Sequence, residues 1–162
     1  MEYLDLFDIN GKNLNKTILR GDKNFLDGEY IKICTVWIKN NDKFLIQKTS
    51  KEKGSDYAVS GGHVPSGTTP ITQAVVELRE ELGIIISETD LNYIGREVIG
   101  HVIFEVYLLE YEKILEQKFE LQKEEVENIN WLTKPEIELL SNERLIRKST
   151  LIQYNNIIKN IF

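Results

Sequence analysis

Cysteine is nearly absent from this sequence. Cys34 is the single cysteine, so the chain cannot form an intrachain disulfide. It lies in an apolar, β-rich run, residues 30–38, which predicts a small buried strand residue rather than a reactive thiol.

Long apolar runs and an excess of basic charge are also missing. No apolar stretch approaches the roughly 18 residues of a membrane span, and residues 1–8 lack the basic-then-apolar pattern of a signal peptide. The formal net charge is −6, whereas a domain that wraps a nucleic-acid backbone usually has a basic face. We therefore expect a cytoplasmic protein that binds neither a membrane nor a nucleic-acid polymer. A small phosphorylated ligand is compatible with the acidic charge, because a bound dication inverts the local charge.

Proline-rich linkers, repeats and low-complexity segments are absent as well, since the 162 residues include only 3 prolines. This predicts one domain over residues 1–162, in which residues 1–28 form an N-terminal hairpin extension and residues 141–162 a C-terminal helix. The composition leaves the oligomeric state open, with a homodimer among the options.

Alternation and turn signals predict strands mixed with a few helices. Strands are predicted at residues 3–8, 17–20, 30–38, 43–48, 91–98, 102–111 and 126–132. A helix is predicted from Pro70 to Leu82, capped by Thr69 and ended by Gly83. Two more are predicted, one starting at Thr133 and an amphipathic one over residues 143–161. The predicted fold class is α/β, a sheet covered by helices on both faces.

Three glutamates share one face of the first predicted helix. Glu77, Glu80 and Glu81 stand at positions i, i+3 and i+4, a spacing at which like charges destabilise a helix by a few tenths of a kcal/mol per pair. A hard divalent cation offsets that repulsion, because Mg²⁺ and Mn²⁺ favour carboxylate and water oxygens. Taken alone, such a cluster is more often a solvated helix face.

The residues around these glutamates resemble the Nudix box. That motif is a glycine, five residues, a glutamate, seven residues, then Arg-Glu-aliphatic-any-Glu-Glu-any-Gly-aliphatic. The matching positions lie within residues 62–84 and are Gly62, Glu77, Leu78, Glu80, Glu81, Gly83 and Ile84. Thr68 stands where the motif has glutamate, and Val76 where it has arginine. The resemblance implies a Nudix-type α/β/α sandwich with a mixed sheet, and the wider pattern resembles isopentenyl diphosphate isomerase-like Nudix hydrolases.

The resemblance also implies a metal-dependent hydrolase that cleaves a diphosphate linkage in a small molecule. Glu77, Glu80 and Glu81 would be catalytic and would bind Mg²⁺ or Mn²⁺ together with the Gly61 carbonyl. A later carboxylate, Glu125 or else Glu124, would complete the metal shell.

Three more residues are candidates for binding the substrate phosphates. Lys48 and Lys53 flank the predicted cleft, although a basic surface loop explains them about as well. His63 follows Gly62 and could donate to a phosphate or position water. His101 has no predicted role.

Two other functions remain open from the sequence. A non-catalytic domain that binds a nucleotide or diphosphate would account for the departures at Thr68 and Val76. An isomerase of the isopentenyl diphosphate type is less favoured, because those enzymes carry a cysteine where this chain has Gly61 and use several histidines, whereas this chain has two.

Overall fold

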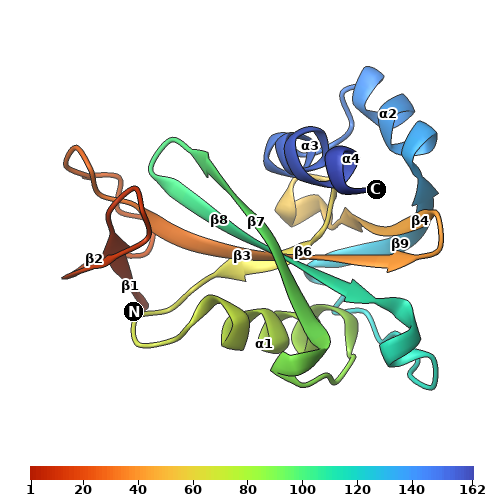
Figure 1. Cartoon of the computed structure of the whole chain (residues 1–162), viewed down its shortest axis with the longest axis horizontal. Coiled ribbons are helices and arrows are strands. Elements are labelled where there is room, and N and C mark those ends of the chain that lie inside the picture. Colours follow the sequence, from red (N-terminus) through yellow and green to blue (C-terminus); the bar gives the residue numbers. More distant parts are fainter.

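A seven-stranded mixed sheet forms the centre of the computed structural model, which describes residues 1–162 (Figure 1). Its strands are β3 (Ile31–Asn40), β4 (Lys43–Thr49), β5 (Tyr57–Ala58), β6 (Ser60–His63), β7 (Leu91–Ile99), β8 (Val102–Glu110) and β9 (Val126–Thr133). The main order is β5-β4-β3-β8-β7, with β6 paired to β3 and β9 to β4. Only the β3–β8 pair is parallel.

The strands β3 and β4 separate beyond their connecting turn. They pair only at Lys39–Phe44 and Asn40–Lys43, as the predicted hairpin. Away from this turn, β6 pairs with β3, whereas β5 and β9 pair with β4. The sheet is therefore forked, and the cleft described below is lined by residues of β3, β5 and β6 near this fork.

Helices cover both faces of the sheet, as the α/β prediction required (Figure 1). On one face lies α1 (Pro70–Leu82), and on the other lie α2 (Lys134–Asn142) and a C-terminal helical segment. That segment comprises α3 (Lys148–Gln153), a π-helical turn η4 (Tyr154–Ile158) and α4 (Lys159–Ile161). Three short 3₁₀ turns lie elsewhere in the chain, at η1 (Lys51–Lys53), η2 (Glu88–Asp90) and η3 (Tyr111–Ile114).

The alternation of β3 builds two hydrophobic cores, because successive strand residues point to opposite faces. Cys34, Val36 and Ile38 join the core under α1, so Cys34 is the buried strand residue that was predicted. Trp37 joins the core under the C-terminal helical segment, together with Tyr154.

The N-terminal residues form a separate two-stranded sheet of β1 (Tyr3–Phe7) and β2 (Asn13–Leu19), hereafter the N-terminal hairpin. The returning strand is longer than the predicted residues 17–20. Figure 1 places the hairpin at one end of the molecule, beside the start of β3. Leu4, Leu6 and Ile18 pack there against Ile31 in a third small core.

The predicted C-terminal helix starts later than its apolar spacing indicated. Residues 143–147 are not in a helix, and α3 begins at Lys148. Arg144 has a positive φ of 59°, and Ile146 forms a β-bridge with Tyr57. Leu145 and Ile146, which matched a helical spacing in the sequence, therefore pair with Tyr57 of β5 instead of forming a helix.

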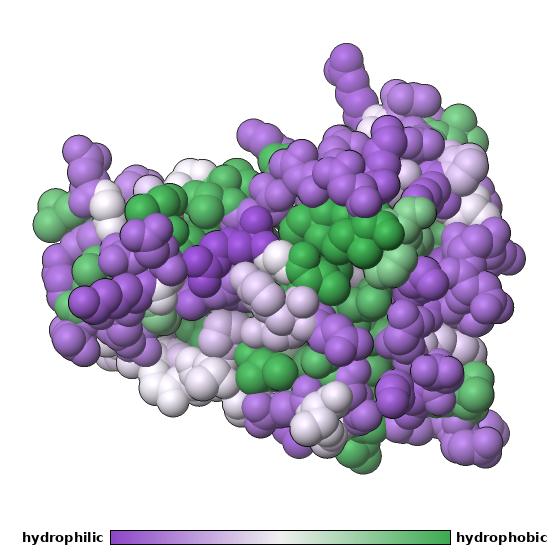
Figure 2. All heavy atoms as spheres, in the orientation of Figure 1, coloured by the Kyte–Doolittle hydropathy of each residue, from purple (hydrophilic) through white to green (hydrophobic).

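The C-terminal helical segment packs closely on β7. Figure 2 shows apolar atoms gathered between these two elements. A Cβ atom at Gly95 would lie 3.1 Å from Cδ1 of Ile157, so a side chain there would require the Ile157 side chain to shift by a few tenths of an ångström. None of the helices has the length and apolar character needed to cross a membrane.

Candidate active site

The helix α1 presents its glutamates to the edge of β6. Thr69 caps the helix by accepting a hydrogen bond from the backbone N–H of Thr72, and Gly83 ends it with a left-handed φ of 68°. Ala74, Leu78 and Leu82 bury the helix against the sheet. Glu77 and Glu81, next to this apolar stripe, therefore lie beside the glycine-containing strand β6.

Glu81 is the most buried of these carboxylates. It is 8% exposed, and its Oε1 accepts hydrogen bonds from Ser60 Oγ at 2.6 Å and from the Gly61 N–H at 3.1 Å. Burial raises the pKa of Glu81 to about 8, and the nearby charges of Glu77 and Glu125 add to the increase. No positively charged side chain forms an ion pair with it.

Glu77 lies against the backbone of Gly62. A Cβ atom at residue 62 would overlap the Glu77 carboxylate, which explains why this position holds glycine. Gln73 Nε2 donates a hydrogen bond to Glu77 Oε1 at 2.8 Å. Burial raises the pKa of Glu77, and the charges of Glu80 and Glu125 raise it further. Glu80 itself is exposed.

Glu125 reaches the same place from a loop before β9. Hydrogen bonds from the backbone N–H groups of Glu120 and Gln122 to the carbonyls of Leu82 and Glu81 tie this loop to the end of α1. The Glu125 carboxylate lines the cleft and pairs with Lys53 Nζ at 3.2 Å. The structure thus places Gly61, Glu81 and Glu125 around one recess, with Glu77 nearby against Gly62.

A cleft of 280 Å³ opens beside these carboxylates. Residues from both chain ends and from the fork of the sheet line it: Arg20, Ile33, Thr35, Lys53, Ala58, Val59, Gly61, Gly62, His63, Phe104, Glu125, Arg147, Ser149 and Thr150. A smaller recess of 70 Å³ shares Gly61 and Glu125 with the cleft and reaches Glu81. The arrangement combines buried acids on one side with cationic side chains around an opening of small-molecule size.

His63 lines this cleft as predicted, whereas His101 is structural. Burial lowers the pKa of His63, and the positive charge of Arg20 lowers it further, so the imidazole is neutral near pH 7. His101 stacks on Phe25 with ring centroids 4.8 Å apart, and its Nδ1 lies 2.7 Å from the Glu29 carbonyl oxygen.

Lys48 and Glu124 are not part of this cleft. Lys48 pairs with Glu127 across β4 and β9 at 3.4 Å. The Glu124 carbonyl accepts a hydrogen bond from Ser50 Oγ. Of the predicted lysines, only Lys53 lies in the cleft.

The sequence analysis missed several polar residues at the site, among them Ser60, Arg20 and Arg147. Ser60 holds Glu81, as described above, and Arg20 and Arg147 line the cleft. Arg147 makes two hydrogen bonds to the carboxylate of Asp56, at 2.9 and 3.0 Å. None of the three occupies a position of the Nudix box, so the motif gave no signal for such a role.

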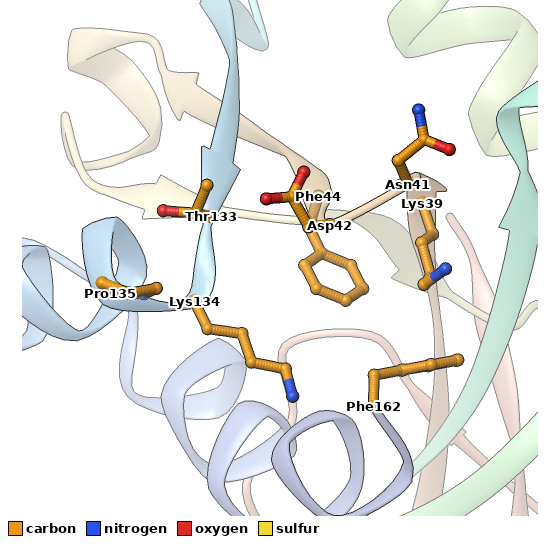
Figure 3. A pocket seen from close by; sticks show the side chains of 8 residues that line it. All are labelled: Lys39, Asn41, Asp42, Phe44, Thr133, Lys134, Pro135 and Phe162. Atoms are coloured by element: carbon orange, nitrogen blue, oxygen red, sulfur yellow. The ribbon is translucent and has the colours of Figure 1, made fainter.

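The largest cavity lies elsewhere. It measures 460 Å³ between the β3–β4 turn, the start of α2 and the C-terminal residue, and in Figure 3 the Phe44 ring lies between Lys134 and Phe162. None of the candidate acids lines it, so we assign the active site to the smaller cleft.

The donor groups at the cleft fit a hard divalent cation. No three His, Cys, Asp or Glu side chains converge closely enough to hold a metal ion unaided. Mg²⁺, however, usually keeps several waters and is bound by one or two carboxylates together with substrate phosphates. The buried Glu81 and the half-buried Glu77, neither of which forms an ion pair, match that donor set.

Comparisons with known proteins agree with this geometry. The chain is 33% identical over 148 residues to an uncharacterised Nudix hydrolase of Listeria monocytogenes, covering 86% of this chain and 85% of that protein. The fold matches DR0079 of Deinococcus radiodurans with a TM-score of 0.72 at 20% identity, covering 91% of this chain and 93% of the other.

A third match is a bifunctional NMN adenylyltransferase/ADP ribose pyrophosphatase of Francisella tularensis, complexed with AMP and a manganese ion. Its TM-score is 0.59 at 15% identity, covering 75% of this chain and 39% of the other. The model of the NUDIX domain family matches residues 31–153 of this chain. This chain therefore belongs to the Nudix family, as a Nudix-type hydrolase of the kind that cleaves diphosphate linkages.

Proposed function

We propose that this protein hydrolyses a diphosphate linkage in a small molecule with the help of Mg²⁺ or Mn²⁺. The observation that carries the proposal is the buried carboxylate of Glu81, with the half-buried Glu77 and with Glu125 nearby, beside a cleft lined by cationic side chains. Burial is the main cause of both raised pKa values, and neighbouring glutamates add to it. Because neither Glu77 nor Glu81 forms an ion pair within the protein, a bound dication would stabilise their charged forms.

The metal would be held by Glu77, Glu80, Glu81 and Glu125 with the carbonyl of Gly61. When bound, it would neutralise charge that develops on the phosphate oxygens and lower the pKa of a water molecule. Glu80 is exposed, and Glu125 lines the recess with Glu81, so both would add ligands to those from Glu77 and Glu81.

The protein's own groups would position the water and the substrate. Glu77 or Glu81 could accept a proton from the attacking water, since a raised pKa brings a carboxylate closer to neutral pH. Lys53 would bind a phosphate oxygen through charge-assisted hydrogen bonds, and neutral His63 would donate a single one.

Cys34 argues against the isomerase reaction. Its Sγ donates a weak hydrogen bond to the Gly62 carbonyl at 3.5 Å, so the thiol lies next to the box in space although it is distant in sequence. The side chain is fully buried, and burial raises its pKa to about 12. A thiol in this setting packs against the core and has no access to a substrate.

A hydrolysis screen that detects both phosphomonoester and inorganic phosphate products tests the proposal. Nucleoside diphosphate derivatives, sugar nucleotides, dinucleotides and prenyl diphosphates would be incubated with the protein, with Mg²⁺ or Mn²⁺ and with chelator. We expect metal-dependent release from at least one class, and nearly none from Glu81→Gln, which keeps the Oε1 acceptor for Ser60 but loses the charge. Metal-dependent binding of a compound without any hydrolysis would instead favour a non-catalytic binding domain.

A further inference from the structure

Arg20 belongs to the N-terminal hairpin region, outside the residues that the Nudix family model matches. That match covers residues 31–153, and Arg20 follows β2 directly. Its side chain nevertheless lines the same cleft as Gly61, Gly62 and His63. The common features of the family therefore assign it no role.

The hairpin is fastened to the glycine-rich segment, so the position of Arg20 is built into the fold. Asp5 accepts hydrogen bonds from Ser66 Oγ at 2.6 Å and from the Gly67 N–H at 3.1 Å. The Ser66 N–H also donates to the Tyr3 carbonyl at 2.8 Å. These bonds tie β1 to the loop that leads from β6 into α1.

A second set of contacts holds the hairpin to the sheet. The backbones of Phe7 and Tyr30 exchange two hydrogen bonds, at 2.8 and 2.9 Å. Arg96 Nη1 on β7 donates to the Asn10 carbonyl in the hairpin turn at 2.9 Å. Because both ends of the hairpin are anchored, Arg20 is presented by a fixed element.

The cations of the cleft are distributed toward two ends. Arg147 donates to the Lys53 carbonyl, so these two side chains mark one end, beside Glu125 and Gly61. Arg20 does not line the recess at that end, and its charge acts on His63 and on Glu77, which lies against Gly62. Gly61 and His63 lie two residues apart on β6, roughly 7 Å along a strand, which leaves room for two linked phosphates.

Arg20 is also free to take a ligand. Its one ion pair is with Glu2, at 2.9 Å, and the two side chains are 50% and 38% exposed. An exposed pair of this kind contributes little to stability, typically up to about 1 kcal/mol. A phosphate, which accepts two parallel hydrogen bonds from a guanidinium, would compete well with this carboxylate.

We infer that Arg20 is a substrate-binding residue for the phosphate at the His63 end of the cleft, through which the enzyme distinguishes two linked phosphates from one. The inference rests on the proposed diphosphatase function. With this role, the N-terminal hairpin becomes part of the active site. The enzyme would then prefer substrates whose diphosphate can reach Arg20 at the His63 end of the cleft.

Titration calorimetry with a non-hydrolysable probe tests the inference without requiring turnover. The probes are methylenediphosphonate and inorganic phosphate, each with Mg²⁺, on the full chain. Removing a charge-assisted hydrogen bond should weaken methylenediphosphonate binding by about tenfold or more in Arg20→Gln. Phosphate binding should change much less, and Arg20→Lys should recover part of the loss.

Two variants control for net charge and for the ion pair. Lys12→Gln removes one positive charge from an exposed site in the same hairpin that is not in the cleft, and should bind both probes like the wild type. Glu2→Gln breaks the same ion pair but leaves Arg20 in place, so it should bind methylenediphosphonate as tightly as the wild type or more tightly.

The outcomes separate this inference from the proposed function. Unchanged binding in Arg20→Gln, or an equal loss for both probes, would overturn the role of Arg20 while hydrolysis by the wild type still supports a diphosphatase. Failure of the wild type to bind methylenediphosphonate would also overturn it. Selective loss of that binding, with no compound hydrolysed in the screen, would support Arg20 and overturn the hydrolase proposal.

Discussion

The Glu77 carboxylate occupies the space that a side chain at Gly62 would fill. Gly61, one residue earlier, is restricted for a different reason, because its Cβ atom would meet the backbone carbonyl of Cys34. The two adjacent glycines therefore have different roles. Gly62 leaves room for Glu77, a candidate metal ligand, and Gly61 allows β6 to pair closely with β3.

Alanine substitutions should separate these two roles. Gly62→Ala should displace the flexible end of Glu77 and lower kcat on the order of 100-fold, with a stability change below about 1 kcal/mol. Gly61→Ala should instead destabilise the fold by about 1–3 kcal/mol, because backbone must move. Turnover assays and urea melts on both variants would check this, and identical behaviour of the two variants would contradict it.

Metal should stabilise the native protein through the acidic face of α1. Ligand that binds only the folded state adds about 2.7 kcal/mol at 100 times its dissociation constant. Thermal melts with Mn²⁺ should therefore shift upward for the wild type and much less for a variant carrying Glu77→Gln, Glu80→Gln and Glu81→Gln. Equal shifts in the two proteins would place the metal elsewhere.

Acid should weaken the fold through Glu105, which accepts hydrogen bonds from Arg96 and Tyr93 and pairs with Lys32 at 2.8 Å. Burial alone would raise its pKa, but Arg96 and Lys32 lower it to about 2, from an ordinary 4.5. The stability that this carboxylate provides is thus complete above about pH 4.5 and is lost as the pH falls toward 2.

Glu105→Gln should accordingly cost about 3 kcal/mol near pH 7, since it leaves the buried Lys32 without its counter-charge. Denaturant melts across pH should show this difference shrinking as the wild type approaches pH 2. The exposed Glu116, changed to Gln, serves as a control with little expected effect. A difference that stayed constant with pH would contradict the assignment.

The two departures from the Nudix box should compensate each other. Thr68 and Val76 replace an acid and a base, and both are half-buried here. Val76→Arg alone should destabilise the protein, because a partly buried lone charge is costly, whereas adding Thr68→Glu should recover much of the loss. A double-mutant cycle by urea melts measures the coupling, and strictly additive effects would refute it.

Local signals in the sequence predicted the fold well, including the helix that carries the candidate acids. The cap, the proline and the terminal glycine of α1 act within a few residues, so its bounds at Pro70 and Leu82 were predicted. The same helical spacing identified Glu77 and Glu81. It could not distinguish the buried Glu81 from the exposed Glu80, because that difference depends on where α1 docks against Ser60.

The remaining parts of the site depend on contacts between distant segments. Arg147 lies in the cleft because residues 145–147 pair with Tyr57, about ninety positions earlier, instead of continuing a helix. Lys48 was proposed for the cleft, but the pairing of β4 with β9 places it beside Glu127. Neither arrangement has a short-range pattern that a single sequence reveals.

The cleft is lined by Arg20, near the start of the chain, and by Arg147, Ser149 and Thr150, near its end. During synthesis the acidic helix can therefore form well before the pocket that it serves, because the last wall is translated after it. Contacts of such long sequence separation also carry a large loop-closure cost and slow folding. Removing the N-terminal hairpin or the C-terminal helical segment should therefore leave the Nudix box present but the substrate cleft incomplete.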